Sequence, residues 1–381
     1  MRNKLFLALF SFGFFSSSAQ TTYYPDSIWQ VKTAAEMMMD KTLLDSAVRF
    51  AVANENKFDR DLRIATLKAY GNEPDFKIIG PTKDRGGTAG LIIKNGYIVA
   101  QWGDVNRVDM TNSVTKSFLS TIAGLAIDEG LIRNVSDKVY NYVWDGTFAG
   151  EHNSKISWEH LLTQSSDWSG TLFDLADWAD RPPKEGGIDD WKNRKLNEPG
   201  SFFKYNDVRV NVMAYSLLQV FRKPLPMVLK EKIMDPIGAS TTWRWYGYDN
   251  SFINIDGLMM QSVSGGGHHG GGLFISTLDQ ARFGLLFLRK GKWRTQQLIS
   301  EKWVRAVHQP SSAFKDYGYM WWMNNSKKWK DVSPDIYYAN GAGGNYIVID
   351  NEHGLVVVTR WMDDSKMGEL MKIIEQSIKN N

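Results

Sequence analysis

Segments typical of β-strands stand near the two ends of this sequence, with a long region between them. Residues 90–102, GLIIKNGYIVAQW, are two β-rich runs around Asn95-Gly96, a dipeptide that favours a tight hairpin. Near the other end, residues 337–350 and 355–362 are rich in Val, Ile and Tyr and are separated by a polar turn. This arrangement predicts an α+β fold with one antiparallel sheet built from both chain ends and flanked by helices.

The region between these strands has helical character. From Asn112 to about Leu131 apolar residues recur with helical spacing, and Gly130 marks the end of the run. Further helices are expected at about 208–222, 226–234 and 364–379. Residues 163–203 are rich in Trp, Asp, Pro and Gly, so we interpret the middle of the chain as helices and loops without strands.

These patterns favour a simple domain organisation. We expect residues 20–381 to form one domain. Within it, a helical subdomain of about residues 111–255 is inserted between sheet-forming segments of about 85–110 and 260–381.

Residues 1–19 have the three regions of a secretory signal peptide: Arg2 and Lys4, then an apolar run, then small residues. We expect cleavage after Ala19, because the alternative of a membrane anchor would need a longer apolar run. With no cysteine in the chain, disulfides and lipid attachment through cysteine are excluded. The protein is therefore expected in a bacterial periplasm or outside the cell, with no stable membrane insertion after cleavage.

Charge argues against nucleic acid as a partner. The formal net charge is +3, and loss of Arg2 and Lys4 with the signal would reduce it to +1. Such a balance supplies no basic field for binding a phosphate backbone.

Two segments have a serine followed three residues later by a lysine. Ser113 and Lys116 stand where the apolar helical run begins, so one helix face would bring hydroxyl and amine together. A helix amino terminus also favours an oxyanion, and a desolvated lysine can act as a base. Ser312 and Lys315 lie in a polar segment and are interpreted as solvated. Taken alone, the spacing is more typical of a capping serine and a lysine that reaches to solvent.

Five segments in the same order resemble the penicillin-recognising serine hydrolases, which include class C β-lactamases, DD-peptidases and related esterases and amidases. The resemblance extends over about residues 85–362, and the branch of 6-aminohexanoate-dimer hydrolases and carboxylesterases is the most similar. The segments are SVTKSFLSTIAGLAIDEGLI (113–132), ISWEHLLTQSSDWSG (156–170), FKYNDVRVNVMAYSLL (203–218), GGGLFISTLDQARFGLLFLRKGKW (270–293) and YGYMWWM (317–323).

This resemblance implies roles for particular residues. Ser113 would be the acylated nucleophile, Lys116 its general base and Tyr205 a proton relay. The backbone N–H groups of Ser113 and Ala342 would form an oxyanion hole. Tentative substrate contacts are Asp207, Asn340, Gly341, Gly343, Trp168 and His269.

The chain departs from the family pattern in two motifs. Asp207 stands where relatives carry asparagine at the end of the tyrosine motif. Residues 339–341, Ala-Asn-Gly, stand where relatives carry a motif that begins with lysine or histidine, so the cation that faces a substrate carboxylate is missing. Weak or no β-lactamase activity is therefore expected.

No cofactor is implied, and no metal site is expected. His268 and His269 are adjacent, so in a strand they would point to opposite faces, and no carboxylate stands at a metal-binding spacing. One of the two could line the cleft instead.

The sequence thus predicts a secreted serine hydrolase that cleaves a small-molecule or short-peptide ester or amide through an acyl-enzyme. A DD-peptidase or β-lactamase is the alternative within catalysis, and a non-catalytic sensor module is the alternative outside it. The physiological substrate and the oligomeric state stay open.

Overall fold

A computed structural model describes residues 22–379. The predicted signal peptide, residues 1–19, lies outside the described residues. In the part of the chain that the structure describes, none of the helices combines the length and apolar content needed to cross a membrane.

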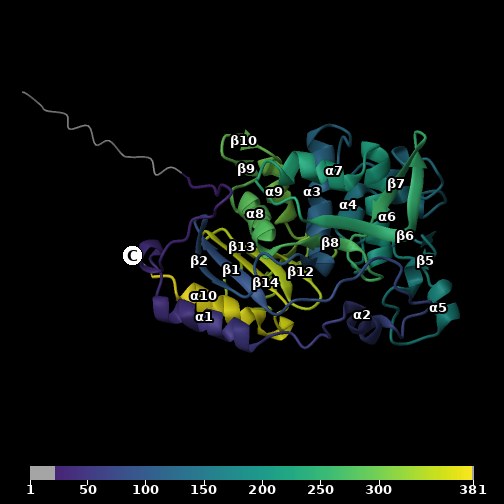
Figure 1. Cartoon of the computed structure of the whole chain (residues 1–381). Coiled ribbons are helices and arrows are strands. Elements are labelled where there is room, and N and C mark those ends of the chain that lie inside the picture. The colour runs from purple at the N-terminus through teal and green to yellow at the C-terminus, as the bar shows by residue number, and fades with distance from the viewer. Residues whose placement is uncertain (1–21, 380–381) are drawn as a thin grey trace, which may run out of the picture.

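The main sheet has six strands in the order β11-β12-β13-β14-β1-β2, all antiparallel to their neighbours. Strands β1 and β2 come from the amino-terminal part of the chain. The other four strands come from the carboxyl-terminal part (Figure 1). This confirms the α+β fold and the sheet built from both chain ends. The strands are β1 (Ala89–Lys94), β2 (Tyr97–Trp102), β11 (Trp322–Met323), β12 (Ile336–Gly341), β13 (Asn345–Asp350) and β14 (Leu355–Arg360).

Alternating side chains of this sheet pack into two separate cores. On β14, Val356 and Val358 belong to the large core shared with helices α3 and α8, whereas Leu355 and Val357 face α1 and α10. Figure 1 shows α1 and α10 side by side on one face of the sheet, although they come from opposite ends of the chain. The period of two in a strand produces this layering.

Ten α-helices surround the sheets or form the helical region in the described part of the chain. The observed helix α3 begins two residues after Ser113, which itself lies in the 3₁₀ turn Asn112–Val114. The α-helices are α1 (Lys41–Ala53), α2 (Leu62–Tyr70), α3 (Thr115–Asp128), α4 (Trp158–Leu162), α5 (Ile188–Lys192), α6 (Asp207–Phe221), α7 (Leu225–Leu229), α8 (Thr277–Leu288), α9 (Glu301–Val307) and α10 (Met367–Gln376).

A second sheet of four strands, in the order β3-β8-β6-β7, differs from the expectation of a strand-free middle. Its longest strand, β6 (Arg244–Ile255), pairs with β7 (Leu258–Val263) around a turn in which Asp256 and Gly257 both have positive φ. The other two strands are β3 (Asp109–Met110) and β8 (Gly272–Ile275). Two short hairpins complete the strands: β4 (Thr171–Leu172) with β5 (Leu175–Ala176), and β9 (Lys292–Trp293) with β10 (Gln296–Gln297).

Arg360, the last residue of β14, joins the two sheets near the start of α3. Its buried guanidinium donates hydrogen bonds to the carbonyl oxygens of Met110 on β3 and Ile275 on β8, each at 2.8 Å. Because β3 leads directly into the turn that carries Ser113, this buried link fixes that turn against the main sheet.

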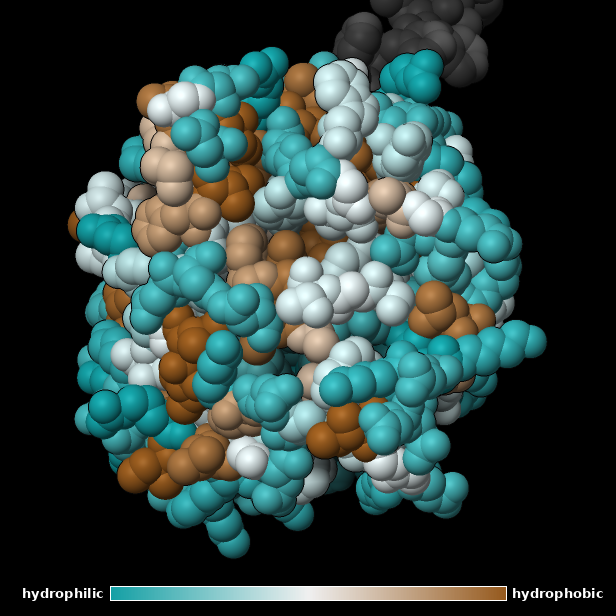
Figure 2. All heavy atoms as spheres, turned by 90° about the vertical axis from the view of Figure 1, so that its right-hand side faces the viewer, coloured by the Kyte–Doolittle hydropathy of each residue, from teal (hydrophilic) through white to brown (hydrophobic). Residues whose placement is uncertain are grey.

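Figure 2 shows the face of the molecule on the right-hand side of Figure 1, around the helical region. Hydrophobic side chains gather there in several separate areas among hydrophilic ones, and the face is hollowed near its centre.

Candidate active site

Ser113 and Lys116 are in direct contact. Lys116 Nζ donates a hydrogen bond of 2.9 Å to Ser113 Oγ, across the turn between β3 and α3. Thr115 Oγ1 donates to the Asn112 carbonyl oxygen at 2.6 Å and accepts from the Leu273 N–H at 3.1 Å, which holds this turn against β8. The spacing of three residues therefore brings together the two side chains that the sequence singled out.

Lys116 is almost completely removed from water, with 1% of its surface exposed. Its Nζ also donates to Asp207 Oδ1 at 2.5 Å, and this carboxylate belongs to the first residue of α6. Burial lowers the pKa of Lys116, whereas the charge of Asp207 acts in the opposite direction and the net shift is downward. An amine with a lowered pKa is available as a base closer to neutral pH.

Asp207 contacts a second cation on its other oxygen. The Arg181 guanidinium lies 2.7 Å from Asp207 Oδ2 and also contacts Asp180, whose carboxylate accepts from the Asp207 backbone N–H. Burial alone would raise the pKa of Asp207, but Lys116, Arg181 and His268 together lower it well below its usual range. Asp207 is therefore a buried, ionised carboxylate held between the Lys116 amine and the Arg181 guanidinium.

Tyr205 forms the side of the site next to α6. Its ring stacks on Trp322, with centroids 5.7 Å apart, and Lys116 Nζ lies 4.8 Å from the centre of the same ring. Burial raises the pKa of Tyr205, the charge of Asp207 adds to this, and the interaction of its hydroxyl with Ser113 acts in the opposite direction. The phenol is therefore held in its neutral form, able to donate a proton.

The end of β12 lies directly beside the nucleophile turn. A side chain added at Gly341 would come within 2.2 Å of the Thr111 carbonyl oxygen and 3.1 Å of the Ser113 nitrogen, so only glycine fits there. The Ala342 carbonyl oxygen accepts hydrogen bonds from Asn112 Nδ2 and Asn345 Nδ2, each at 2.8 Å. Ala342 is thus fixed next to Ser113.

The other residues of this strand end have different surroundings. Asn340 is partly exposed and precedes the close contact at Gly341. A side chain at Gly343 would come within 2.7 Å of the buried Trp361 ring. Internal packing is therefore sufficient to require glycine at position 343.

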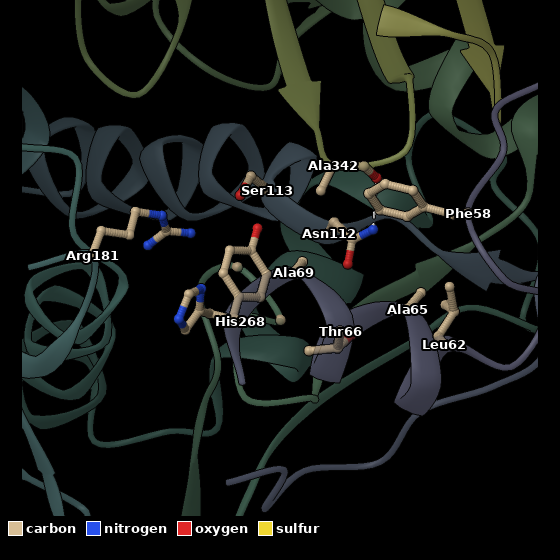
Figure 3. Close-up of a pocket in the computed structure, with 13 residues that line it drawn as sticks. Phe58, Leu62, Ala65, Thr66, Ala69, Asn112, Ser113, Arg181, His268 and Ala342 are labelled. Carbon is tan, nitrogen blue, oxygen red and sulfur yellow. Dashed lines mark hydrogen bonds between the residues drawn. The ribbon is translucent and has the colours of Figure 1, made fainter. Parts of the chain in front are cut away.

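A pocket opens at Ser113, and helix α2 forms one of its walls (Figure 3). Leu62, Ala65, Thr66 and Ala69 of α2 face Asn112 and Ala342 across it, and Arg181 and His268 lie at the other end. The cavity volume is about 20 Å³, which is enough for a group about the size of one water molecule. The wall from α2 lies outside the segments that carried the family resemblance.

His268, rather than His269, lines this pocket. Its Nε2 lies 2.6 Å from Glu73 Oε2, and its Nδ1 lies 3.9 Å from Asp207 Oδ2. His269 is turned away, with Nδ1 2.9 Å from the Lys77 carbonyl oxygen. Both histidines thus hold the segment that follows α2.

The donor atoms of Glu73, Asp180 and His268 lie within 4.8 Å of one another, close enough to share a metal ion. The Arg181 guanidinium already contacts Asp180 in this cluster. A cation is therefore supplied there by the protein itself, and the cluster is better described as an ion-pair network.

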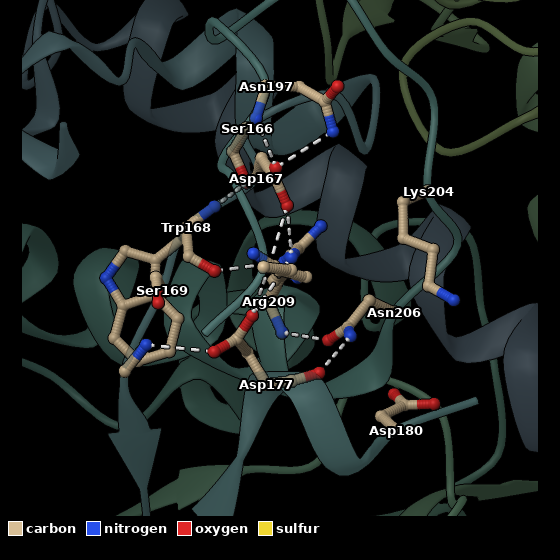
Figure 4. Close-up of polar contacts among 12 residues, drawn as sticks. Ser166, Asp167, Trp168, Ser169, Asp177, Asp180, Asn197, Lys204, Asn206 and Arg209 are labelled. Carbon is tan, nitrogen blue, oxygen red and sulfur yellow. Dashed lines mark hydrogen bonds and ion pairs between the residues drawn. The ribbon is translucent and has the colours of Figure 1, made fainter. Parts of the chain in front are cut away.

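Trp168 lies in the core, 3% exposed, with its indole N–H donating to the Thr147 carbonyl oxygen at 2.8 Å. Its own carbonyl oxygen accepts from Arg209 Nε, within a network in which Arg209 also pairs with Asp167 and Asp177 (Figure 4). This network fixes the loop before α6 onto that helix. It thereby places Arg181 and Asp207 next to each other.

Ser312 and Lys315 are exposed and do not line the pocket at Ser113. The sequence did not single out Arg181, Asp180, Glu73 or helix α2, which the structure brings to the site. Arg181 stands in a polar loop without periodicity, so the only available signal was the unexplained Asp207, which requires a partner when buried.

Comparisons with known proteins show the family and the fold of this chain. The family model described as Beta-lactamase matches residues 77–361, and the chain belongs to that family. This confirms the resemblance to the penicillin-recognising serine hydrolases. No match was found among curated proteins.

Solved structures with the same fold share little sequence with this chain. A protein assigned as a β-lactamase from Bacteroides dorei DSM 17855 has a TM-score of 0.60 and 15% identity, over 90% of this chain and 100% of that one. A protein assigned as a 6-aminohexanoate-dimer hydrolase from Bacillus anthracis has a TM-score of 0.56 and 14% identity, over 90% and 96%. A family VIII carboxylesterase has a TM-score of 0.56 and 16% identity, over 87% and 97%.

Proposed function

We propose that this protein is a serine hydrolase that cleaves an ester or amide through an acyl-enzyme on Ser113. The observation that carries the proposal is the 2.9 Å hydrogen bond between Lys116 Nζ and Ser113 Oγ, made by a lysine that is 1% exposed. A buried lysine in contact with a serine hydroxyl has a direct path for the proton that the serine must lose.

The proposed reaction has two steps. Ser113 Oγ bonds to the substrate carbonyl carbon while its proton passes to neutral Lys116. The bond to the leaving group then breaks as that group takes this proton from Lys116 through Tyr205, which leaves Lys116 neutral again. In the second step water attacks the acyl carbon and gives up a proton through Tyr205 and Lys116. The bond between the acyl carbon and Ser113 Oγ breaks, and this second proton passes to Ser113 Oγ as the carboxylic acid product leaves. The N–H groups of Ser113 and Ala342 stabilise the oxyanion in both steps.

The charges around Ser113 favour a neutral substrate. Arg181 lines the pocket, but two carboxylates, Asp180 and Asp207, already contact its guanidinium. A substrate carboxylate would lose its hydration here without meeting a free cation. Neutral esters carry no such penalty, which supports an esterase or amidase with weak or no β-lactamase activity.

A DD-peptidase or β-lactamase is the second candidate, and Arg181 at the pocket is the observation in its favour. A rearrangement that released Arg181 from one carboxylate would supply the missing cation. A non-catalytic sensor module is the third, and the Ser113–Lys116 contact argues against it because binding alone does not need an amine buried against the serine.

We further propose a periplasmic or secreted location in a bacterium, from the signal-like residues 1–19. The proposed reaction needs no cofactor. The partners that we propose are small-molecule or short-peptide substrates, with no role for nucleic acid.

Labelling with a fluorophosphonate probe, followed by mass mapping of the modified residue, tests the proposal. We expect one label, on Ser113, lost in Ser113→Ala and retained in Ser312→Ala, which serves as the matched control. Absence of labelling in the folded wild-type protein would leave the sensor module as the better description.

Substrate class is tested by comparing kcat/KM for 4-nitrophenyl butyrate and nitrocefin. After correction for intrinsic reactivity, we expect a higher kcat/KM for the ester than for nitrocefin. This ester-to-nitrocefin ratio should be roughly a hundredfold higher than in a related site that has a free cation. A clear preference for nitrocefin or a D-alanyl-D-alanine peptide would favour the second candidate.

A further inference from the structure

The position of Asp207 raises a question that the proposed function does not answer. A base must be neutral to accept a proton, yet Lys116 contacts an ionised carboxylate at 2.5 Å. Such a contact stabilises the protonated lysine and so opposes its role as a base. The other cation on Asp207, Arg181 at 2.7 Å, competes with Lys116 for the same negative charge.

We propose that Asp207 is the internal counter-anion of the site, and that through Lys116 and Arg181 it sets both the pH range of catalysis and the exclusion of anionic substrates. This inference rests on the proposed function, because it assigns a control residue to the same reaction. Asp207 acts through its two neighbours and is therefore a positioning residue.

The first half of the inference concerns the proton on Lys116. Arg181 draws on the carboxylate from the far side and repels a proton on Lys116, so it offsets the effect of Asp207. Removing the charge of Asp207 should make Lys116 easier to deprotonate, and removing Arg181 should make it harder. The two variants are expected to act in opposite directions.

Other titratable groups surround this pair without contacting Lys116 Nζ as closely as Asp207 does. They come from the end of α2 and the segment after it, the loop before α6, the second sheet, the loop before β8 and the segment before β11. The groups are Asp180, Lys204, Tyr205, Tyr70, Glu73, Tyr248, His268, His269 and Tyr317.

The second half of the inference concerns the substrate. Arg181 is 27% exposed at its side chain and lines the pocket at Ser113, so a substrate group can approach it. Asp207, which is 1% exposed, contacts Arg181 from the protein side and satisfies its charge. With asparagine at this position, Arg181 would keep only Asp180 and would attract a substrate carboxylate.

The pH half is tested by measuring the rate at which a fluorophosphonate labels Ser113 as a function of pH, which requires no substrate. In Asp207→Asn we expect the acid limb of the profile to move to lower pH by about one unit or more. In Arg181→Gln we expect it to move to higher pH. Asp279→Asn is the matched control, because Asp279 is also buried but accepts its hydrogen bonds from Ser240.

The substrate half is tested with two esters that share a leaving group and a four-carbon acyl chain: 4-nitrophenyl butyrate and mono-4-nitrophenyl succinate. The background of Ser113→Ala is subtracted for each. We expect the succinate-to-butyrate ratio of kcat/KM to rise about tenfold in Asp207→Asn and to fall in Arg181→Gln. Because it is a ratio, the fraction of folded enzyme cancels.

The outcomes separate the two proposals. Labelling of wild-type Ser113 with an unchanged acid limb and an unchanged ratio in Asp207→Asn overturns the inference and leaves the serine hydrolase intact. Shifts of the two variants in the same direction overturn it as well. A folded wild-type protein that is not labelled at all contradicts the proposed function and removes this inference with it.

Discussion

At the scale of single residues, the contact between Lys116 and Asp207 couples activity to stability. In Lys116→Met, which keeps the length of the side chain but lacks the amine, we expect kcat/KM to fall by roughly a thousandfold or more. We also expect a loss of stability below the roughly 3–5 kcal/mol typical of breaking a buried ion pair, because Arg181 still contacts Asp207. Ester hydrolysis and urea unfolding measure the two effects.

The double variant Lys116→Met, Asp207→Asn is the control for this prediction. It removes both charges of the pair, so we expect it to recover part of the lost stability but none of the lost activity. Recovery of activity in the double variant would assign the base to a group other than Lys116.

The pH dependence of the wild-type protein follows from the same burial. The pKa of Lys116 is lowered by removal from water, so kcat/KM for 4-nitrophenyl acetate should rise with pH through a value below the ordinary lysine pKa of about 10.4. The lowered pKa also means that the unfolded chain binds more protons than the folded one between the two values. Stability should therefore increase with pH in that window. A rate that falls as pH rises from 6 to 9 would contradict a neutral lysine base.

The sequence indicated the Ser113–Lys116 pair because a spacing of three residues is a local property of one turn. The contacts of Lys116 with Asp207 and of Asp207 with Arg181 join segments that are far apart in the chain. Periodicity and spacing carry no information about such contacts. Asp207 was recognised as a departure from the family pattern, but its effect on Lys116 could only come from the structure.

At the scale of elements, helix α3 holds Lys116 in place through close packing at Gly124. In an exposed helix, alanine would be favoured over glycine by about 1 kcal/mol. Here an added methyl group would lie 2.6 Å from the Trp303 ring of α9, and such overpacking costs about 1–3 kcal/mol. We therefore expect Gly124→Ala to lower the free energy of unfolding in urea rather than raise it. An increase would show that Trp303 can shift freely.

The elements that could be predicted are those with a strong local pattern. The β1–β2 hairpin around Asn95-Gly96 and the helix α6 both occur within a few residues of their expected positions. The β6–β7 hairpin was missed because polar residues interrupt the apolar alternation of β6. Its turn, Asp256-Gly257, carried a hairpin signal of the same kind as Asn95-Gly96.

At the scale of the whole molecule, the amino-terminal segment is part of the site although the family resemblance began after it. Helix α2 forms a wall of the pocket at Ser113, and Glu73, which follows α2, contacts His268. The helix buries only Leu62 and Ala65, whereas its apolar residues Ile64 and Leu67 are exposed, so its sequence did not indicate which face covers the site. Its place over the nucleophile follows from the packing of the complete chain.

The joining of both chain ends in one sheet leads to a prediction about cooperativity. Leu370 of α10 is completely buried between α1 and the sheet, on the face opposite α3. Leu370→Ala should lower the free energy of unfolding by about 2–5 kcal/mol, through lost burial and the cavity left behind. The same sheet carries the main core and the strand next to Ser113. We therefore expect fluorophosphonate labelling and the near-UV circular dichroism of the tryptophans to be lost with the same urea midpoint. Glu369→Ala, on the exposed side of the same helix, should leave both midpoints unchanged. If Leu370→Ala loses the α10 packing while Ser113 is still labelled at higher urea, the two faces of the sheet unfold independently and the molecule is not one cooperative unit.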